Sequence, residues 1–389
     1  MTQKQEFDVL IIGGGIIGLS IARELNKRGI KRIAVFQSYF DSPNTASHAA
    51  AGMLAPQGEV DANNEFFGLC AASRDLYKGF ANELFEETGV DVELERSGSL
   101  HLAFDENDLQ KLEKRFEWQT SAKLEVEKLT AREVLKLEPN LSDKVLGALR
   151  FPNDWQVENR NILGALQQYC LEETSSISNF YEADSIGFKD NRIIVKERDK
   201  KVPPLEIKLR GKTVAAKQVV IASGAWASKF DFPFDVSAFK VKPIRGQMIS
   251  FRSDEQKFRH VINTPRGYVV PRRGGRILVG ATVEDVGFNR NVTANGLNYL
   301  TSTALEISPR FGDLSFEESW CGFRPKTSDG FPLLGEFPKN SGLFWATGHY
   351  RNGILLAPAT AKLIADKIVD NVDSPFLETF NPNRFQNDL

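Results

Sequence analysis

Three glycines near the N-terminus, Gly13, Gly15 and Gly18, have a spacing that suits close contact with phosphate groups. In this GxGxxG pattern the first glycine permits a tight turn, the second lets the backbone approach a pyrophosphate, and the third lets helix and strand pack closely. The N-terminus of the following helix favours the negative charge. The pattern alone also fits a purely structural turn, but here it follows an apolar strand and opens a helix. We therefore predict a dinucleotide site at this turn.

The position that ends the second strand of such a unit usually carries an acidic residue, which binds the ribose hydroxyls. This chain has Gln37 there. The amide oxygen accepts a hydrogen bond but lacks the charge and the bidentate acceptance of a carboxylate. We expect weaker nucleotide binding than an acid would give, and Asp41 lies too far along the chain to replace it. This departure does not decide between FAD and NAD.

The turn must be positioned by a strand before it and a helix after it. Residues 7–12 are apolar and β-branched, as in a buried parallel strand. The following helical pattern ends near Gly29, where a C-terminal cap glycine belongs. Residues 33–36 form a second short apolar strand, so the order predicts a βαβ unit and a parallel sheet. The apolar face of the helix consists of Ile17, Ile21, Ala22 and Leu25.

Further elements follow along the chain. Strands are expected at 219–222 and 343–346, and a turn and a helix at about 354–369 follow the second of these. Alternating pieces at 267–271 and 276–281, on either side of the turn 273–275, predict an antiparallel block within 241–281. Residues 105–140 indicate charged surface helices, and 198–204 a hairpin tip. A helix at 65–90 is expected to bury Phe66, Leu69, Leu76, Phe80, Leu84 and Phe85.

These elements predict an α/β protein with a Rossmann-like nucleotide-binding domain and an inserted antiparallel-sheet domain. We assign residues 1–85, 145–235 and 318–389 to the nucleotide-binding domain. The substrate-binding domain is expected to comprise residues 86–144 and 236–317. A chain of 389 residues is long enough for two or three such units.

Composition excludes several other classes of protein. The 49 Lys and Arg residues nearly balance 51 Asp and Glu, so no basic field indicates nucleic acid or an anionic membrane. The three cysteines are far apart, which argues against a disulfide framework or a zinc cluster and fits the cytoplasm. No apolar run resembles a signal peptide or a membrane span.

Six segments together resemble the D-amino-acid-oxidase-like flavoproteins, and within them the glycine-oxidase subfamily of thiamine biosynthesis. The similarity spans nearly the whole chain and implies FAD, held without a covalent bond. It also implies a homotetramer. The segments are DVLIIGGGIIGLSIARELNKRG, SHAAAGMLAPQ, VVIASGAWAS, YVVPRRGGRILVGAT, GFRPKTSDGFPLLG and GHYRNGILLAPAT.

The resemblance implies a role in FAD binding for four groups of residues. Those at the pyrophosphate are Gly13, Gly15, Ile16, Ile17 and Gly18, and those at the adenosine are Gln37, Ser38 and, by a loose alignment, Ser185. Those on the flavin side are Ala46, Ser47, Ala51, Gly52 and Met53. Those around the pyrimidine edge of the flavin are His349, Tyr350, Arg351, Asn352, Gly353, Ile354 and Leu355.

The resemblance also implies that Arg324 binds the substrate carboxylate, that Tyr268 assists and that Arg351 lies beside the substrate. A planar guanidinium offers a carboxylate two parallel donors. From the residues alone, Arg324 could equally pair with Asp329 or Glu318. Tyr268 could be a core residue of its strand, and Arg351 a solvated turn residue.

No dedicated general base is evident, which fits direct hydride transfer from a neutral amine to the flavin. His349 is expected to be a hydrogen-bonding turn residue, and the helix after Gly353 to direct its N-terminus at the flavin N1–O2 edge. Cys321 raises a second possibility, because a cysteine in this neighbourhood carries the flavin covalently in related monomeric sarcosine oxidases. A small buried thiol is the ordinary interpretation.

The activity implied by the resemblance is oxidative deamination of glycine and other small amines, such as sarcosine or D-alanine. Oxygen would yield hydrogen peroxide, and the imine would supply thiazole formation. Val283 is expected to help set the pocket volume. Alternatives are a dehydrogenase that uses another electron carrier, and a flavin domain that modifies tRNA, which would need a basic face. A catalytically inactive flavin subunit would have no use for Tyr268 with Arg324.

Overall fold

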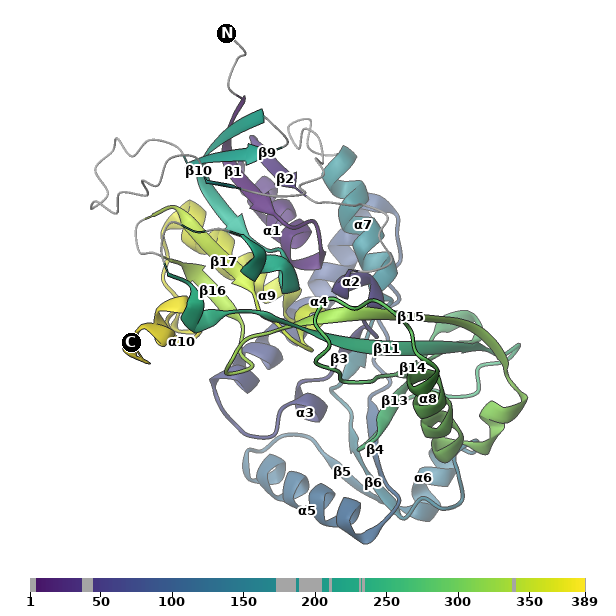
Figure 1. Cartoon of the computed structure of the whole chain (residues 1–389). Coiled ribbons are helices and arrows are strands. Elements are labelled where there is room, and N and C mark those ends of the chain that lie inside the picture. The colour runs from purple at the N-terminus through teal and green to yellow at the C-terminus, as the bar shows by residue number, and fades with distance from the viewer. Residues whose placement is uncertain are drawn as a thin grey trace.

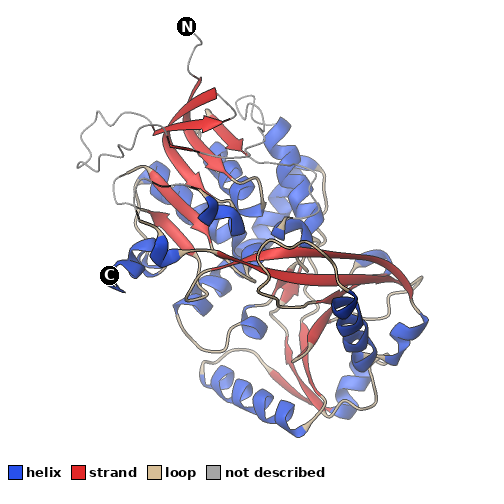
Figure 2. Cartoon of the chain, viewed as in Figure 1, coloured by secondary structure: helices blue, strands red, loops and turns tan. Residues whose placement is uncertain are grey.

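The computed structural model describes residues 5–36, 45–172, 187–188, 205–209, 212–230, 232, 235–337 and 341–388. Its two large sheets lie one above the other in Figure 1, with helices packed against each (Figures 1 and 2). Among the described residues, no helix combines the length and apolar character that crossing a bilayer requires.

The first sheet contains the predicted parallel core. β1 (Gln5–Ile12) pairs in parallel with β2 (Ile33–Phe36) and β10 (Lys212–Ile221), and β10 pairs in parallel with β17 (Leu343–Thr347). Antiparallel strands extend the sheet: β16 (Leu333–Glu336) beside β17, and β9 (Leu205–Leu209) with β8 (Gly187–Phe188) beside β10. Both faces of β1, β2 and β17 are buried, which explains their uninterrupted apolar sequences.

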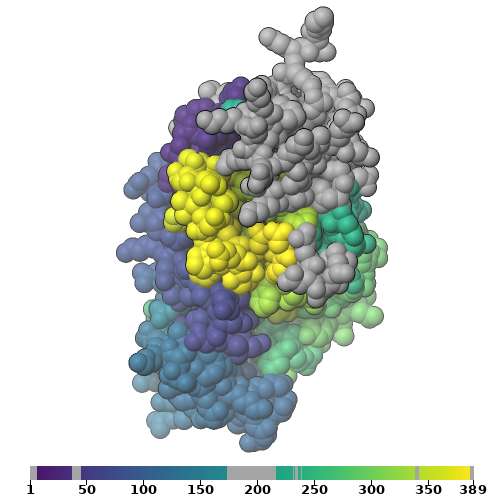
Figure 3. Space-filling view, turned by 90° about the vertical axis from the view of Figure 1, so that its left-hand side faces the viewer, coloured from purple at the N-terminus to yellow at the C-terminus, as the bar shows by residue number. Residues whose placement is uncertain are grey.

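Two helices, α1 (Ile16–Lys27) and α9 (Gly353–Ala365), contact one face of this sheet, and α4 (Glu65–Thr88) and α7 (Asn159–Glu172) pack against them. α9 contacts α1, so the two ends of the chain share one layer. Figure 3 shows C-terminal segments in yellow beside N-terminal segments in purple. The βαβ prediction is therefore confirmed, and Gly29 at the end of α1 has φ +90°.

The predicted helix at 65–90 is confirmed, but part of its expected apolar stripe was wrong. Leu76 and Phe85 are 39% and 54% exposed. Small and polar side chains are buried instead, because α4 packs closely against α9. The buried positions of α4 are Phe67, Leu69, Cys70, Ser73, Tyr77, Phe80, Ala81 and Leu84.

The second sheet has the strand order β15-β11-β14-β13-β12-β4-β6-β5 and is antiparallel except for the pair β12 and β4. The predicted hairpin is confirmed: β13 (Gly267–Pro271) and β14 (Arg276–Gly280) flank the 3-10 turn Arg273–Gly275. The other strands are β15 (Ser315–Lys326), β11 (Lys242–Arg252), β12 (Val261–Thr264), β4 (Ser99–Ala103), β6 (Gly147–Phe151) and β5 (Glu127–Thr130).

Three helices accompany this sheet: α5 (Glu106–Ser121), α6 (Ala131–Leu137) and α8 (Ala294–Ile307). All of β6 and β15 lies in the sheet, although the boundaries expected at 145 and 318 would give them, wholly or partly, to the nucleotide-binding domain. We keep the two-domain division as a proposal, with these strands moved to the substrate side. The expected hairpin tip at 198–204 lies outside the described residues.

Short elements join the two sheets. β3 (Met53–Leu54) pairs with β7 (Trp155–Gln156), and the helices α2 (Ala46–Ala49) and α3 (Pro56–Glu59) flank β3. The remaining short elements are the turns Gly224–Lys229, Ser237–Phe239, Pro309–Asp313 and Pro382–Asp388, a π-helical turn Asp366–Asp370 after α9, and α10 (Pro375–Thr379).

Candidate active site

A cavity of about 1540 Å³ lies between the two sheets. The nucleotide side contributes the glycine turn, the segment 45–53 and the loop 222–226. The C-terminal turn 346–354 lies along it, and the second sheet closes the far side. Among the residues of that sheet that line the cavity are Gly246, Met248, Tyr268, Gly322 and Arg324.

The glycine turn is shaped as its sequence pattern requires. Gly13 has φ +120°, and a Cβ there would lie 2.3 Å from the carbonyl oxygen of Ala222. A Cβ on Gly18 would lie 1.8 Å from the Gly13 carbonyl oxygen, so only glycine lets α1 approach β1. Gly13, Gly15, Ile16 and Ile17 line the cavity, whereas Gly18 acts behind them, through packing.

Two hydroxyl groups lie at this end of the cavity. Ser47 accepts the backbone N–H of Ile16 at 3.0 Å. The Ser223 hydroxyl lines the cavity, is buried and has no hydrogen-bond partner among the described residues. A buried hydroxyl normally has a partner, so Ser223 fits a bound polar ligand. Gln37, Ser38 and Ser185 lie outside the described residues, and their roles remain predictions.

The segment expected on the flavin side forms one wall of the cavity. Ala46, Ser47, Ala51, Gly52 and Met53 all line it. α2 is capped by Thr45, whose side chain accepts the backbone N–H of His48 at 3.2 Å. Gly52 has φ +68°, and a Cβ there would lie 2.0 Å from the carbonyl oxygen of Val157.

The C-terminal turn lies against the same cavity through the six residues His349, Tyr350, Arg351, Asn352, Gly353 and Ile354. Leu355, expected beside them, is 1% exposed and does not line the cavity, so its role stays a prediction. His349 is buried, its Nε2 lies 3.0 Å from the Thr360 hydroxyl, and burial lowers its pKa to about 3. It is therefore neutral near pH 7, as expected of a hydrogen-bonding residue.

α9 begins at this turn, and side chains of α4 form hydrogen bonds with backbone groups of its first turns that lack their usual partners. Pro358 has no N–H to donate to the carbonyl of Ile354, which instead accepts the hydroxyl of Tyr77. Ser73 donates to the carbonyl of Leu355 at 2.6 Å and accepts the N–H of the residue one turn later, Ala359, at 3.2 Å. The buried polar positions of α4 therefore hold the end of α9 that meets the cavity.

Arg324 and Tyr268 converge at the opposite side of the cavity. The Arg324 Nη1 donates to the carbonyl oxygen of Thr282 at 3.0 Å, and the guanidinium covers Gly246, where a Cβ would lie 2.4 Å away. The Tyr268 hydroxyl interacts with Arg324. Burial raises the pKa of Tyr268 and outweighs the opposite effect of Arg324, so the phenol remains neutral.

The alternative partners of Arg324 are occupied elsewhere. Asp329 pairs with Arg384 at 2.8 Å, and Glu318 pairs with Arg160 at 2.8 Å. Among the described residues Arg324 has no carboxylate partner, although it lines the cavity. A guanidinium in this position can bind an anionic ligand.

Sequence reasoning missed one carboxylate that lines the cavity. Glu59 ends α3, and its Oε2 lies 3.7 Å from the Nη1 of Arg351. Arg351 itself is 45% exposed, so its position is compatible with both the substrate role and the solvated-turn alternative. Only Pro56, a favoured first residue of a helix, marked α3 in the sequence.

α3 is held at both ends by side chains from distant segments. Asp154 accepts the first backbone N–H groups of the helix, and Arg115 of α5 donates to its last carbonyls. Burial raises the pKa of Asp154 to about 7 despite these donors. The distances are 3.1 Å from Gln57 N and 2.9 Å from Gly58 N to Asp154, and 2.8, 3.0 and 3.2 Å from Arg115 to the carbonyls of Gln57, Gly58 and Val60.

Cys321 does not line the cavity, although the three residues that follow it on β15, Gly322, Phe323 and Arg324, do. Its thiol donates to the carbonyl oxygen of Arg290 at 3.1 Å, and burial raises its pKa. The position fits a structural thiol rather than a flavin attachment site. No group of three or more His, Cys, Asp or Glu side chains among the described residues could hold a metal ion.

The fold and cavity are those of a dinucleotide-binding oxidoreductase, and the Arg324 guanidinium is among the groups that line the cavity. A family model described as FAD dependent oxidoreductase matches residues 8–367. The chain belongs to this family, and its cofactor is FAD. The glycine cradle, the Ser223 hydroxyl and the N-terminus of α9 fit that cofactor.

Individual relatives give a more specific similarity than the family model does. The chain is 35% identical over 372 residues to a glycine oxidase of Geobacillus kaustophilus, covering 95% of this chain and 94% of the relative. It is 36% identical over 383 residues to a bifunctional ThiO/ThiG protein of Synechocystis, of which it covers 54%. The crystal structure of glycine oxidase from Geobacillus kaustophilus superposes with a TM-score of 0.86 at 33% identity, covering 98% and 99% of the two chains.

Proposed function

We propose that this enzyme oxidises glycine and other small amines, including sarcosine and D-alanine. The substrate loses a hydride from Cα and a proton from nitrogen, and water converts the resulting imine into a 2-oxo acid and ammonia, or methylamine when the substrate is sarcosine. Oxygen accepts the two electrons and two protons and leaves as hydrogen peroxide. The observation that carries this proposal is the Arg324 guanidinium, which lines the cavity without a carboxylate partner among the described residues.

The residues of the chain supply binding and orientation. Arg324 binds the substrate carboxylate through parallel donors, and the neutral Tyr268 hydroxyl adds a further hydrogen bond. FAD supplies the acceptor for the hydride. His349 is neutral and bonded to Thr360, so it holds the C-terminal turn rather than moving a proton. We therefore assign no general base, and the substrate reacts as the neutral amine.

Arg351 is proposed to lie next to the substrate, with Glu59 opposite it at 3.7 Å. This charged pair at the cavity restricts which amines fit, because a bulky or charged substituent on the substrate would displace Arg351 or Glu59. Val283 lines the same cavity and is 52% exposed, which supports its proposed part in setting the pocket volume.

We further propose that the imine supplies thiazole formation in thiamine biosynthesis. One supporting observation is the Synechocystis relative, whose bifunctional name joins ThiO to ThiG in one chain. We also propose a cytoplasmic homotetramer with non-covalent FAD. The buried, unlinked cysteines are consistent with a reducing compartment, and light scattering on the purified holoenzyme measures its mass.

The test is a peroxide assay across glycine, sarcosine, D-alanine, D-proline and L-amino acids, with dye reduction measured in parallel. Peroxide with glycine and small amines is the expected result. Strong dye reduction with little peroxide would instead indicate a dehydrogenase, and no turnover of any substrate would overturn the proposal. Acid precipitation checks the cofactor linkage, because a yellow supernatant indicates free flavin and a yellow pellet indicates a covalent bond.

A further inference from the structure

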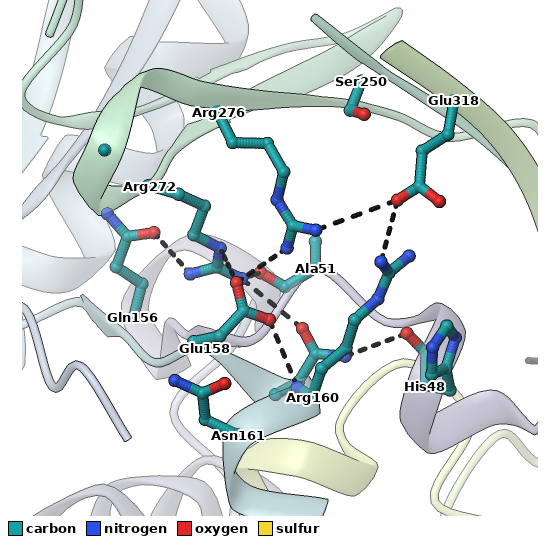
Figure 4. A network of polar contacts seen from close by, with 12 residues as sticks. His48, Ala51, Gln156, Glu158, Arg160, Asn161, Ser250, Arg272, Arg276 and Glu318 are labelled. Carbon is teal, nitrogen blue, oxygen red and sulfur yellow. Dashed lines mark hydrogen bonds and ion pairs between the residues drawn. The ribbon is translucent and has the colours of Figure 1, made fainter. Parts of the chain in front are cut away.

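The wall of the cavity on the proposed flavin side is held from behind by a buried arginine. Arg272 follows β13 and is 4% exposed, although it carries a guanidinium. Figure 4 shows its side chain directed at Ala51, between Gln156 and Glu158. Burial lowers its pKa to about 10, so it remains charged near neutral pH. A charge is rarely buried without a specific set of partners.

The three nitrogens of the Arg272 guanidinium have different partners. Nη2 donates to the carbonyl oxygen of Ala51 at 2.6 Å, and Nη1 donates to Oε1 of Gln156 at 2.9 Å. Nε lies 3.4 Å from Oε2 of Glu158. Two in-plane donors with separate acceptors fix the orientation of the guanidinium and, through it, the Ala51 carbonyl.

This contact sets the direction of one N–H group. Among the described residues the single cis peptide bond joins Gly280 and Ala281, so the bond from Ala51 to Gly52 is trans. In a trans peptide the N–H points opposite to the carbonyl. The Ala51 carbonyl faces Arg272, which does not line the large cavity, whereas Ala51 and Gly52 do. The Gly52 N–H therefore points into the cavity.

Neighbouring contacts prevent this peptide from turning over. The Gly52 carbonyl accepts the N–H of Val157 at 2.9 Å, and a Cβ on Gly52 would lie 2.8 Å from Nη2 of Arg272. Asn159 donates to the carbonyl of Ser47 at 2.7 Å, which secures the other end of the wall. The backbone of this wall is thus held from the side away from the cavity.

We propose that Arg272 is a positioning residue that keeps the Gly52 N–H aimed at the flavin ring. The inference rests on the proposed placement of the flavin along this wall and is independent of the substrate. A fixed donor beside an acceptor edge of the ring binds more strongly when the ring gains negative charge. Arg272 therefore favours the reduced cofactor without touching either cofactor or substrate.

A purely structural role in the surrounding ion pairs would make a different prediction. Arg276 donates to Glu158 at 2.7 Å and lies 3.8 Å from Glu318, so it shares the network (Figure 4). Within the described part of the chain, it forms no hydrogen bond or ion pair with the wall. Arg276→Met is therefore the matched control, since it removes one charge from the same cluster. If these ion pairs only stabilise the packing of the sheet against α7, Arg272→Met and Arg276→Met should change the properties of the bound flavin to a similar extent.

The experiment measures the flavin absorption spectrum, the sulfite dissociation constant and the reduction potential of purified holoenzymes without substrate. Arg272→Met should weaken sulfite binding about tenfold, which corresponds to about 30 mV for a two-electron couple. Arg276→Met should remain within about twofold of the wild type, since its contacts lie away from the wall. Equal values for Arg272→Met and Arg276→Met would overturn the proposal, whether or not both differ from the wild type.

Arg272→Lys is the second variant, because Arg272→Met leaves buried acceptors without a donor and could fail to fold. Lysine keeps the charge but not the planar pair of donors. Its expected loss of sulfite affinity is about threefold, between the wild type and Arg272→Met. If only Arg272→Lys yields holoenzyme, a sulfite constant equal to that of the wild type overturns the proposal. None of these readouts depends on which amine the enzyme oxidises.

Discussion

The two ends of the cavity are built in different ways. At the dinucleotide end, the contacts come from backbone: Gly13 and Gly18 create space that a single Cβ would fill. At the substrate end, they come from side chains on separate elements, namely Arg324 on β15, Tyr268 on β13 and Glu59 on α3. The glycine turn of the first end lies within one βαβ unit, whereas the second end combines strands of the second sheet with α3.

This difference predicts different sensitivities. A site formed by backbone is disrupted when a substitution adds side-chain volume. The stretch from Gly13 to Ile17 carries no titratable side chain, so its binding should not depend directly on pH. A side-chain site fails when charge or a donor is removed, and it depends on pH through buried acids such as Asp154. Substitutions at the two ends should therefore separate loss of cofactor from loss of substrate binding.

The largest expected effect is that of Gly18→Ala. The new Cβ would meet the Gly13 carbonyl at 1.8 Å, so α1 must move away from β1. We expect a loss of more than about 3 kcal/mol in the free energy of unfolding, together with loss of FAD. Thermal denaturation and flavin content measure both. Gly164→Ala in α7, where a Cβ has open space, is the control and should not destabilise the fold. Wild-type flavin content in Gly18→Ala would refute the backbone-cradle account.

Arg324→Met should act only at the substrate end. Loss of a charge-assisted hydrogen bond costs about 1.5–3 kcal/mol, which raises the apparent KM for glycine roughly 10- to 150-fold. Flavin content should stay at the wild-type level. Steady-state kinetics test this, with the exposed Arg310→Met as the control. A KM within twofold of the wild type would remove Arg324 from the site.

Asp154→Asn tests the pH dependence of the substrate end. Burial raises the pKa of Asp154 from 3.8 to about 7, so the folded state binds a proton that the unfolded state releases. The contribution of this group to stability is therefore lost as pH rises from about 4 to 7. Denaturant titrations should show that the wild type loses stability across this window relative to Asp154→Asn, by a few kcal/mol. Parallel pH profiles for the two proteins would contradict this assignment.

The smallest expected effect is that of Arg351→Gln. Arg351 is 45% exposed and lies 3.7 Å from Glu59, and an ion pair this exposed contributes less than about 1 kcal/mol. The KM for glycine should change less than about fivefold, with kcat preserved. A rise comparable to that of Arg324→Met would show that Arg351 binds the carboxylate directly, and the two ends would then be less distinct.

Much of the dinucleotide end could be predicted from sequence because its determinants are local. The turn from Gly13 to Gly18 and its flanking strand and helix are contiguous, and each glycine has a steric reason for its position. The antiparallel hairpin at Arg273–Gly275 was predictable for the same reason, since alternation and turn residues are short-range signals. Gln37, the departure from the pattern, lies outside the described residues.

The substrate end was predictable only in part. The sequence left the partner of Arg324 open among Asp329, Glu318 and a substrate, and ion pairs with Arg384 and Arg160 removed the two acids. α4 shows the same limit, since Ser73 and Tyr77 are buried by their contacts with α9 while the more apolar Phe85 is exposed. Contacts between distant segments decided each of these outcomes.

By itself, the sequence determined the βαβ unit, the glycine cradle and the residue types able to bind a dinucleotide and a carboxylate. Periodicity and glycine spacing act within a few residues, so they can be read without the fold. Only the tertiary structure brought Glu59 to the cavity, capped α3 with Asp154 and placed Arg272 behind Ala51. Burial and the direction of a peptide group depend on which distant segments pack together, and no local pattern encodes that packing.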